Sequence, residues 1–232
     1  ASDVYKRQGY ANLKTKEKLT ENHSFQLASV SKPFTSVAIL QLIENGQINL
    51  NDTLQNFFPN FPYEGITIHQ LLCHRSGLSQ YTHFCDAPDS IWPDKSKTIN
   101  NQDVIDIISK INPLINYPPD IKYYYCNTNY LLLASIVKKI SGIEFKQYLK
   151  ENIFSPIDMN NSIVYDRTNF NDLIMPTQGY ENRTPWEDVY LNGVVGDKGV
   201  YSTTMDLLKF DNVQTPKSHH PLHHYLTTLL LY

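Results

Sequence analysis

The stretch of residues 25–42 constrains the fold of this chain more than any other segment. It opens with a short apolar approach that ends in small residues, and its second half repeats apolar residues with the period of a helix. The apolar positions form a broad face made of Leu27, Val30, Phe34, Val37, Ile39, Leu40 and Leu42. Such a wide apolar face is typical of a helix that is mostly buried. The pattern predicts a core helix from about Ser29 to Glu44, ending at Asn45-Gly46.

Ser29 and Lys32 lie at the start of this predicted helix. A spacing of three places both side chains on one face, so the amine can reach the hydroxyl. A desolvated lysine loses its proton more readily and can activate a serine for nucleophilic attack. Pro33 fits the first turn, whose amides have no intrahelical partner. The structural alternative is a Ser29 that caps the helix and a Lys32 that extends to solvent, and the short motif alone does not exclude it.

The composition is that of a globular protein. Of the 232 residues, 41% are hydrophobic and 19% are charged, and the formal net charge is −3. A chain of this length forms one large domain or two small ones. No long basic run occurs, which argues against a nucleic-acid surface and a polybasic membrane patch. The sequence shows neither a signal peptide nor a transmembrane span.

The cysteines and two of the histidines do not form a metal motif. Cys73, Cys85 and Cys126 lack the spacing of metal ligands, and we expect free thiols, with a disulfide between Cys73 and Cys85 as the alternative. His69 and His74 belong to a helix expected over 68–74 after the cap Thr67, but they are not spaced as ligands on one face. We therefore expect them to be hydrogen-bonded structural residues. No metal site and no cofactor are predicted.

Both ends of the chain have an unusual composition. Residues 3–8 resemble the translation of a sequencing adaptor, so we expect residues 1–8 to be an artefact outside the fold. After Asp211 the helical pattern disappears, and residues 212–232 are expected to be a tail unrelated to the domain at 9–211. The histidine pairs within 219–224 are an alternative metal site, but Pro221 interrupts the helix that would align them. We expect the chain to be a fragment of a longer protein.

The rest of the chain alternates helices with short extended segments. Further helices are expected at 100–111, 130–140, 144–152 and 205–210, and strands at 9–13, 162–165 and 177–180. Gly193, Gly196 and Gly199 indicate a loop whose backbone approaches another group closely. Neither a repeat nor a domain linker occurs. The order predicts an α/β (α+β) fold in which a helical region, about residues 50–160, is inserted into an α/β layer.

A second chemical motif is Tyr125-Cys126-Asn127. A tyrosine just before a helix, followed by an asparagine two residues later, presents a phenol and an amide to the same space. Beside a cationic lysine the pKa of the phenol falls, so that it can act as a base or pass a proton to a leaving group. The asparagine can donate to a substrate carbonyl or hold the lysine. The alternative is a tyrosine-rich loop with a capping asparagine.

Four segments, taken together, favour the functional interpretation of these motifs over the structural one. Residues 25–32, 66–78, 125–130 and 196–203 occur in an order and at distances that resemble the serine β-lactamase-like family. This family includes class C β-lactamases, penicillin-binding D-alanyl-D-alanine carboxypeptidases and related esterases. The resemblance covers about residues 9–211. It implies an antiparallel sheet flanked by helices, with an inserted helical region, and a serine hydrolase that forms an acyl-enzyme.

The resemblance assigns roles to four residues. Ser29 matches the nucleophile, Lys32 the base that shares its proton, and Tyr125 the second general acid/base. Asn127 matches the polar group that faces substrate and lysine. The backbone amide of Ser29 would be one oxyanion donor, since it lies at a helix N-terminus. The segment 197–203 lies beside the cleft in the family, and we assign no catalytic role to it.

One element of the family pattern is missing. The third motif, Lys- or His-x-Gly on a strand that lines the cleft, normally lies beyond residue 211, and neither Lys198-Gly199 nor the segment 219–224 matches it. The second oxyanion donor and the C-terminal strands of the sheet would be absent with it. Loss of one such donor typically costs about 100- to 1,000-fold in rate. We therefore expect this chain to be nearly inactive and its parent to be active.

The substrate class stays open at this point. β-Lactamase, peptidase and esterase share the Ser-x-x-Lys and Tyr-x-Asn motifs, and the rival reading is a non-catalytic member that binds its ligand without turnover. Expected partners are a small-molecule or peptide substrate and no nucleic acid, while the motifs leave membrane association and oligomeric state undecided. Members of the family usually act outside the cytoplasm, so we expect an exported parent.

Overall fold

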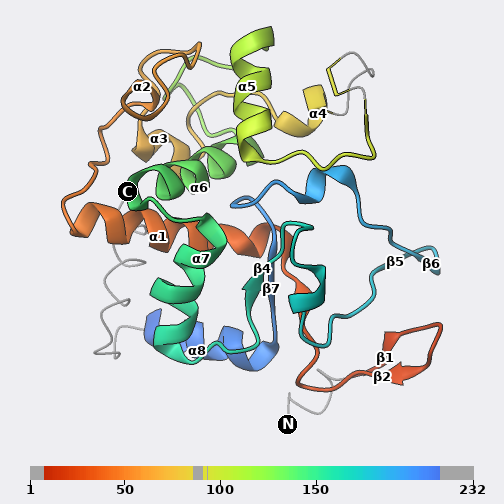
Figure 1. Ribbon diagram of the computed structural model, residues 1–232. Helices are drawn as coiled ribbons and strands as arrows, with labels where there is room; N and C mark the ends of the chain where they lie inside the picture. The colour runs from red at the N-terminus through yellow and green to blue at the C-terminus, as the bar shows by residue number, and fades with distance from the viewer. Residues whose placement is uncertain (1–7, 86–90, 93, 215–232) are drawn as a thin grey trace.

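Helix α1 (Lys32–Glu44) runs through the middle of the molecule, as Figure 1 shows. The computed structural model describes residues 8–85, 91–92 and 94–214. A short 3₁₀ turn, η2 (Ala28–Ser31), leads into α1. Every residue from Phe34 to Leu42 is buried, which confirms the predicted core helix. Residues 1–7 of the predicted artefact, and the predicted tail after Gln214 with its histidine pairs, lie outside the described residues.

Five helices gather on one side of α1, the upper side in Figure 1. They are α2 (Leu54–Phe57), α3 (Ile68–Leu72), α4 (Tyr81–Cys85), α5 (Asn101–Ile111) and α6 (Asn127–Ser141). All five lie within the helical region predicted at about residues 50–160. Thr67 caps α3 by accepting from the Gln70 amide, and Asn100 caps α5 by accepting from Gln102 and Asp103. Helix α6, with its buried leucines, packs against α1.

Helix α6 begins earlier than the sequence pattern predicts. Its first residue is Asn127, because Cys126 has an extended backbone and the side-chain oxygen of Gln80 accepts the amide proton of Asn127 at 2.8 Å. A partner from another segment thus satisfies a first-turn amide that the helix itself cannot pair. The helix ends at Gly142, where φ is +75°, a left-handed C-cap of the kind that glycine adopts readily.

Two helical segments lie on the other side of α1, the lower side in Figure 1. The first is α7 (Phe145–Leu149), which continues as a π turn, η3 (Lys150–Phe154), and a 3₁₀ turn, η4 (Ser155–Ile157). The second is α8 (Thr204–Gln214), which extends past the predicted end at Phe210. The rings of Phe34 in α1 and Phe210 in α8 have centroids 4.3 Å apart, so α8 helps to close the core beneath α1.

A three-stranded antiparallel sheet flanks the start of α1. Its order is β3 (Phe25–Gln26), β7 (Val200–Ser202) and β4 (Ile163–Val164), with Phe25 opposite Ser202 and Ile163 opposite Tyr201. The strand predicted at 162–165 is confirmed by β4. The central strand β7 was not predicted, since it follows the glycine-marked loop and is only three residues long. The mixed fold with antiparallel sheets and flanking helices agrees with the predicted fold class.

Two hairpins complete the described strands. They are β1 (Tyr10–Asn12) with β2 (Glu17–Lys18), and β5 (Tyr180–Glu181) with β6 (Thr184–Pro185). The first confirms the strand predicted at 9–13. The strand predicted at 177–180 is largely wrong, because only Tyr180 belongs to a strand. The amides of Thr177 and Gln178, which lie outside any strand, donate to the carbonyls of Ser24 and Ala11. Short 3₁₀ turns occupy Phe170–Asp172 (η5) and Tyr190–Asn192 (η6).

The cysteines agree with the sequence-based expectation. Cys73, Cys85 and Cys126 are all free thiols, and the alternative disulfide between Cys73 and Cys85 is absent. Over residues 8–85, 91–92 and 94–214, no helix combines the length and the apolar character that crossing a bilayer would require.

Candidate active site

Ser29 occupies a turn that the central strand of the sheet holds in place. The amide of Leu27 donates to the carbonyl of Val200 at 2.9 Å, and the amide of Val200 donates to Oγ of Ser31 at 3.0 Å. Between them Ala28 has φ of +46°, a left-handed conformation that is uncommon for a residue other than glycine. The short strand β7 therefore fixes the turn on both sides of Ser29 and sets the direction of its side chain.

Lys32 is buried beside Ser29 and donates three hydrogen bonds. Its Nζ lies 3.1 Å from Oγ of Ser29, 2.8 Å from Oδ1 of Asn127 and 2.9 Å from the carbonyl oxygen of Asp197. Only 6% of Lys32 is exposed, which makes these partners essential to a polar group removed from water. The ammonium also lies over the ring of Tyr125, 4.9 Å from its centroid.

Tyr125 completes the contacts of the serine. Its hydroxyl donates to Oγ of Ser29 at 2.6 Å, and the side chain is 38% exposed. The structure thus brings together all four residues that the sequence motifs single out, Ser29, Lys32, Tyr125 and Asn127. Ser29 and Lys32 come from the start of α1, and Tyr125 and Asn127 from the start of α6.

His74 and Gln80 hold the Tyr125–Asn127 turn. Nδ1 of His74 accepts the amide proton of Cys126 at 3.1 Å, and its ring packs on the Tyr125 ring with centroids 4.5 Å apart. Nε2 of Gln80 donates to the carbonyl of Tyr125 at 2.9 Å. His69 lies 3.6 Å from Sγ of Cys73, so both histidines have the structural contacts that we expected. The position of His74 against Tyr125 was not predicted.

The surroundings of His74 keep its imidazole neutral. Burial, and secondarily the nearby charge of Lys32, lower its pKa from the ordinary 6.5 to about 4. A neutral ring is required here, because Nδ1 must be unprotonated to accept the Cys126 amide. The histidine therefore adds no positive charge beside Lys32 at neutral pH.

Asp197 also contributes to the site, although neither sequence motif contains it. Its carbonyl accepts from Lys32, and its carboxylate oxygen Oδ2 accepts from the hydroxyl of Tyr81 at 3.0 Å. The residue is 2% exposed, and burial raises the pKa of its carboxyl, while Lys198 and Lys32 oppose that rise. The segment 196–203 was recognised as part of the family pattern, but a backbone acceptor leaves no signature in sequence.

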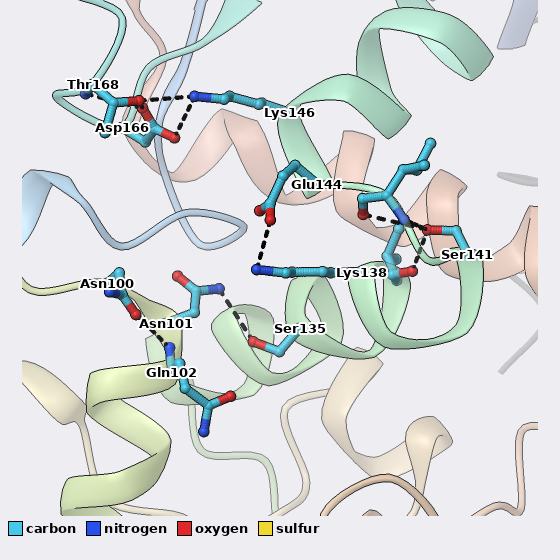
Figure 2. Close-up of polar contacts among 12 residues, drawn as sticks. Asn100, Asn101, Gln102, Ser135, Lys138, Ser141, Glu144, Lys146, Asp166 and Thr168 are labelled. Carbon is cyan, nitrogen blue, oxygen red and sulfur yellow. Dashed lines mark hydrogen bonds and ion pairs between the residues drawn. The ribbon is translucent and has the colours of Figure 1, made fainter.

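A side-chain network outside the serine site anchors the loop that carries Asp197. The Asn101 side chain accepts from the Val195 amide at 2.8 Å and donates to the Val195 carbonyl at 3.0 Å. In Figure 2 the same side chain reaches from α5 toward Ser135 on α6. Oγ1 of Thr35 donates to the carbonyl of Gly196 at 2.7 Å. The backbone before Asp197 is therefore fixed independently of the Asp197 side chain.

These loop anchors border a cavity of about 730 Å³ that none of the four motif residues lines. It lies between α5, α6 and the start of α7, and Asn101, Ser135, Lys138, Glu144 and Asp166 are among its lining residues. Figure 2 shows Lys138 paired with Glu144, at 2.7 Å, and Asp166 paired with Lys146. Side chains of both charges line the cavity, two lysines and three acids, so its wall is not a patch of one sign.

Within the described part of the chain, no group of three or more histidine, cysteine, aspartate or glutamate side chains is arranged to hold a metal ion. The chemistry that the site can perform is that of a serine hydroxyl between an amine and a phenol. An amine and a phenol within hydrogen-bond reach of one hydroxyl can take up its proton and return it.

Comparisons with known proteins identify the family of the chain. The family model described as Beta-lactamase matches residues 2–227. Penicillin-binding protein 4* of Bacillus subtilis (strain 168) is 36% identical over 220 residues, which cover 88% of this chain and 47% of that protein. The putative penicillin-binding protein PbpX of the same strain is 29% identical over 208 residues, covering 88% of this chain and 49% of that protein. The chain thus spans about half the length of these curated relatives.

Solved structures show the same similarity. The octameric penicillin-binding protein homologue from Pyrococcus abyssi has a TM-score of 0.74 at 26% identity and covers 88% of this chain and 48% of its own. D-amino acid amidase from Ochrobactrum anthropi SV3 has a TM-score of 0.73 at 26% identity, covering 89% of this chain and 59% of its own. The chain belongs to the beta-lactamase family, the serine hydrolases that include the penicillin-binding proteins.

Proposed function

We propose that this chain carries the nucleophile side of a serine hydrolase that cleaves amides or esters through an acyl-enzyme on Ser29. One observation carries the proposal: Oγ of Ser29 lies within hydrogen-bond distance of both Nζ of Lys32, at 3.1 Å, and the hydroxyl of Tyr125, at 2.6 Å. A serine that only caps a helix does not require both a buried amine and a phenol on its oxygen.

The acylation step follows from these contacts. Oγ of Ser29 attacks the carbonyl carbon of the substrate, and its proton passes to the Lys32–Tyr125 pair. The carbonyl oxygen becomes an oxyanion, which the backbone amide of Ser29 stabilises. Collapse of this intermediate breaks the bond to the leaving group, which leaves with a proton from the pair. Water then attacks the Ser29 ester, the pair again handles the proton, and the acid is released.

Tyr125 and Lys32 have different shares in this proton transfer. Tyr125 is 38% exposed and can reach the leaving group of a bound substrate, whereas Lys32 is 6% exposed and donates to protein groups. We assign the direct exchange with the substrate to Tyr125, and to Lys32 the role of base and positive charge behind it.

The two polar atoms of the Asn127 side chain have different partners, Lys32 for the oxygen and the substrate for the nitrogen. Its Oδ1 accepts from Lys32 at 2.8 Å, which fixes the amide orientation. The Nδ2 group of the same amide is then available to donate to the substrate carbonyl or side-chain amide. Asn127 therefore binds substrate while it holds Lys32 near Ser29.

The proposed substrates are small molecules or peptides with a reactive carbonyl: a β-lactam, a D-Ala-D-Ala peptide or another D-amino acid amide, or an ester. The similarity to penicillin-binding proteins and to a D-amino acid amidase supports this class. The same similarity supports an exported parent. We further propose that these 232 residues by themselves turn substrate over slowly, because no Lys- or His-x-Gly motif, which supplies the second oxyanion donor in the family, occurs among them. The loss of one such donor typically costs about 100- to 1,000-fold in rate.

A turnover assay tests this function. The chain and its Ser29→Ala variant are incubated with a chromogenic cephalosporin, a D-amino acid amide and a short-chain nitrophenyl ester. We expect slow hydrolysis of at least one substrate by the chain and none above background by the variant. Equal rates in the two proteins would contradict the proposal. Saturable binding with no turnover, and no covalent adduct, would favour the non-catalytic alternative.

A further inference from the structure

One glutamine side chain bridges the main chain of Tyr125 and Asn127. Nε2 of Gln80 donates to the carbonyl of Tyr125 at 2.9 Å, and Oε1 of the same amide accepts from the amide of Asn127 at 2.8 Å. Between them Cys126 has an extended backbone, with φ of −142° and ψ of 120°. In an extended chain the carbonyl of one residue and the amide of the second residue after it face the same edge. The Gln80 amide therefore takes the place of a neighbouring strand on that edge.

His74 holds the opposite edge of the same three residues. Its Nδ1 accepts from the amide of Cys126 at 3.1 Å, and Cys126 is buried. Successive side chains of an extended segment point to opposite faces, so Tyr125 and Asn127 share the face that Cys126 does not. Within residues 125–127, His74 thus hydrogen-bonds the middle residue, whereas Gln80 bonds the two residues that carry the proposed chemistry.

Tyr125 and Asn127 must reach the site at the same time. The hydroxyl of Tyr125 lies 2.6 Å from Oγ of Ser29, and Oδ1 of Asn127 lies 2.8 Å from Nζ of Lys32. Both contacts form together only while the backbone at 125–127 keeps its extended geometry. Asn127 is also the first residue of α6, where an amide has no partner within the helix itself. The Gln80 side chain supplies that partner.

The main chain on both sides of Gln80 is fixed against the next residue of α6. Oγ1 of Thr128 donates to the carbonyl of Ser79 at 2.6 Å and accepts from the amide of Tyr81 at 2.8 Å. These two bonds do not involve the Gln80 side chain. A substitution of Gln80 therefore removes the contacts to Tyr125 and Asn127 and leaves the surrounding support in place.

We propose that Gln80 is a positioning residue for acylation. Its side-chain amide fixes the main chain of Tyr125 and Asn127, and so sets where their side chains meet the serine and the lysine. This role rests on the proposed function, because it concerns the groups that handle the serine proton and bind the substrate. It adds a residue that lies outside the Ser-x-x-Lys and Tyr-x-Asn motifs.

A first experiment compares the rates at which a fluorescent penicillin acylates Ser29. Gln80→Met keeps the length of the side chain but removes both hydrogen bonds. We expect its rate to fall about 10- to 100-fold, since a misplacement of about 1 Å can cost about 100-fold. Gln55→Met is the matched control and should keep the parent rate, because Nε2 of Gln55 also bonds a loop carbonyl, that of Tyr63, at 2.7 Å. The parent rate in folded Gln80→Met would overturn the role of Gln80.

Gln80→Glu separates positioning from packing. A protonated glutamic acid can donate to the Tyr125 carbonyl and accept from the Asn127 amide as glutamine does, whereas a carboxylate can only accept. With the ordinary pKa of about 4.3, roughly a sixth of such groups are protonated at pH 5 and about one in 5,000 at pH 8. The acylation rate of Gln80→Glu relative to the parent chain should therefore rise as the pH falls from 8 to 5.

The ratio of the two rates isolates residue 80. Division by the parent rate at the same pH removes the titration of Lys32, Tyr125 and His74, which both proteins share. The corresponding ratio for Gln80→Met should stay constant, since methionine does not titrate. A ratio for Gln80→Glu that is equally constant from pH 8 to 5 would overturn the role of Gln80.

Amide hydrogen exchange separates this role from the proposed function, since it needs no acylation. The amide of Asn127 should exchange faster in Gln80→Met than in the parent chain, while that of Cys126, bonded to His74, should keep its rate. Faster exchange at Asn127 with no acylation of Ser29 in any protein would contradict the proposed function alone. Unchanged exchange at Asn127 would overturn the role of Gln80 whether or not Ser29 is acylated. If Gln80→Met does not fold, Gln80→Ala takes its place in both measurements.

Discussion

The hydroxyl of Tyr125 lies 2.6 Å from Oγ of Ser29, although 96 positions separate the two residues in the chain. The contact joins the turn η2, which leads into α1, to the segment just before α6, and these two helices pack against each other. The proton of the serine therefore has a short path to a phenol that is open to solvent. This relationship makes the role of Tyr125 testable apart from that of Lys32.

Replacing Tyr125 should impair acylation without unfolding the chain. In Tyr125→Phe the ring keeps its packing on His74, but the hydroxyl that contacts Ser29 is removed. General acid–base catalysis typically contributes about 100- to 10,000-fold, so we expect a fall of that size in the rate at which a fluorescent penicillin labels the protein. Tyr123→Phe is the control, since Tyr123 is 61% exposed and has only an edge contact with His74. Equal labelling rates in the two variants would remove Tyr125 from the mechanism.

His74 should make the stability of the fold depend on pH. Its pKa is about 4 in the folded state and about 6.5 when unfolded, so the unfolded chain binds the proton more readily. The stability that the neutral ring contributes is complete above about pH 6.5 and is lost as the pH falls toward 4. The difference corresponds to at most about 3 kcal/mol.

Urea unfolding between pH 7 and 4 checks this expectation. His74→Asn keeps an acceptor for the Cys126 amide and tolerates the left-handed backbone at this position, where φ is +55°. It cannot titrate, so its free energy of unfolding should decline less steeply than that of the parent chain over this pH range. Parallel declines would show that His74 is not the group responsible.

Gly196 should tolerate no side chain. Its φ is +105°, and an added Cβ would lie 2.4 Å from the Tyr130 carbonyl oxygen and 2.5 Å from Cβ of Ala134. Gly142→Ala is the matched control, since its φ is also positive, at +75°, but the space around it is open. We expect about 1–2 kcal/mol of destabilisation for the control, from backbone strain, and about 1–3 kcal/mol more for Gly196→Ala, from overpacking. Similar unfolding free energies for the two variants would contradict the close packing of this loop on α6.

The sequence predicted the parts of the site that side-chain type and helical spacing can encode. The apolar face of 25–42 indicated a buried helix, and the spacing of Ser29 and Lys32 placed an amine beside a hydroxyl. Tyr125 and Asn127 lie beside Ser29 and Lys32 because α6 packs against α1, and no local sequence pattern encodes that packing. The expectation that the four residues meet came from the family resemblance.

The missed features depend on backbone geometry. The carbonyl of Asp197 accepts from Lys32 because the loop at 196–199 turns toward it, and any residue type carries a carbonyl. The strand β7 is too short for an alternating pattern and is stabilised by its neighbours β3 and β4. The start of α6 at Asn127 depends on Gln80, which lies far away in sequence. In each case the deciding partner is distant in the chain.

Peptide mapping of the acylated protein tests the central claim most directly. The chain is treated with excess fluorescent penicillin, quenched, digested and analysed by mass spectrometry, with Ser29→Ala treated in parallel. A single acylation needs no later hydrolysis, so a slow enzyme still accumulates the adduct. We predict one penicilloyl group per chain, located on Oγ of Ser29 and absent from the variant. An adduct on another residue such as Ser31, or equal labelling of the Ser29→Ala protein, would contradict it.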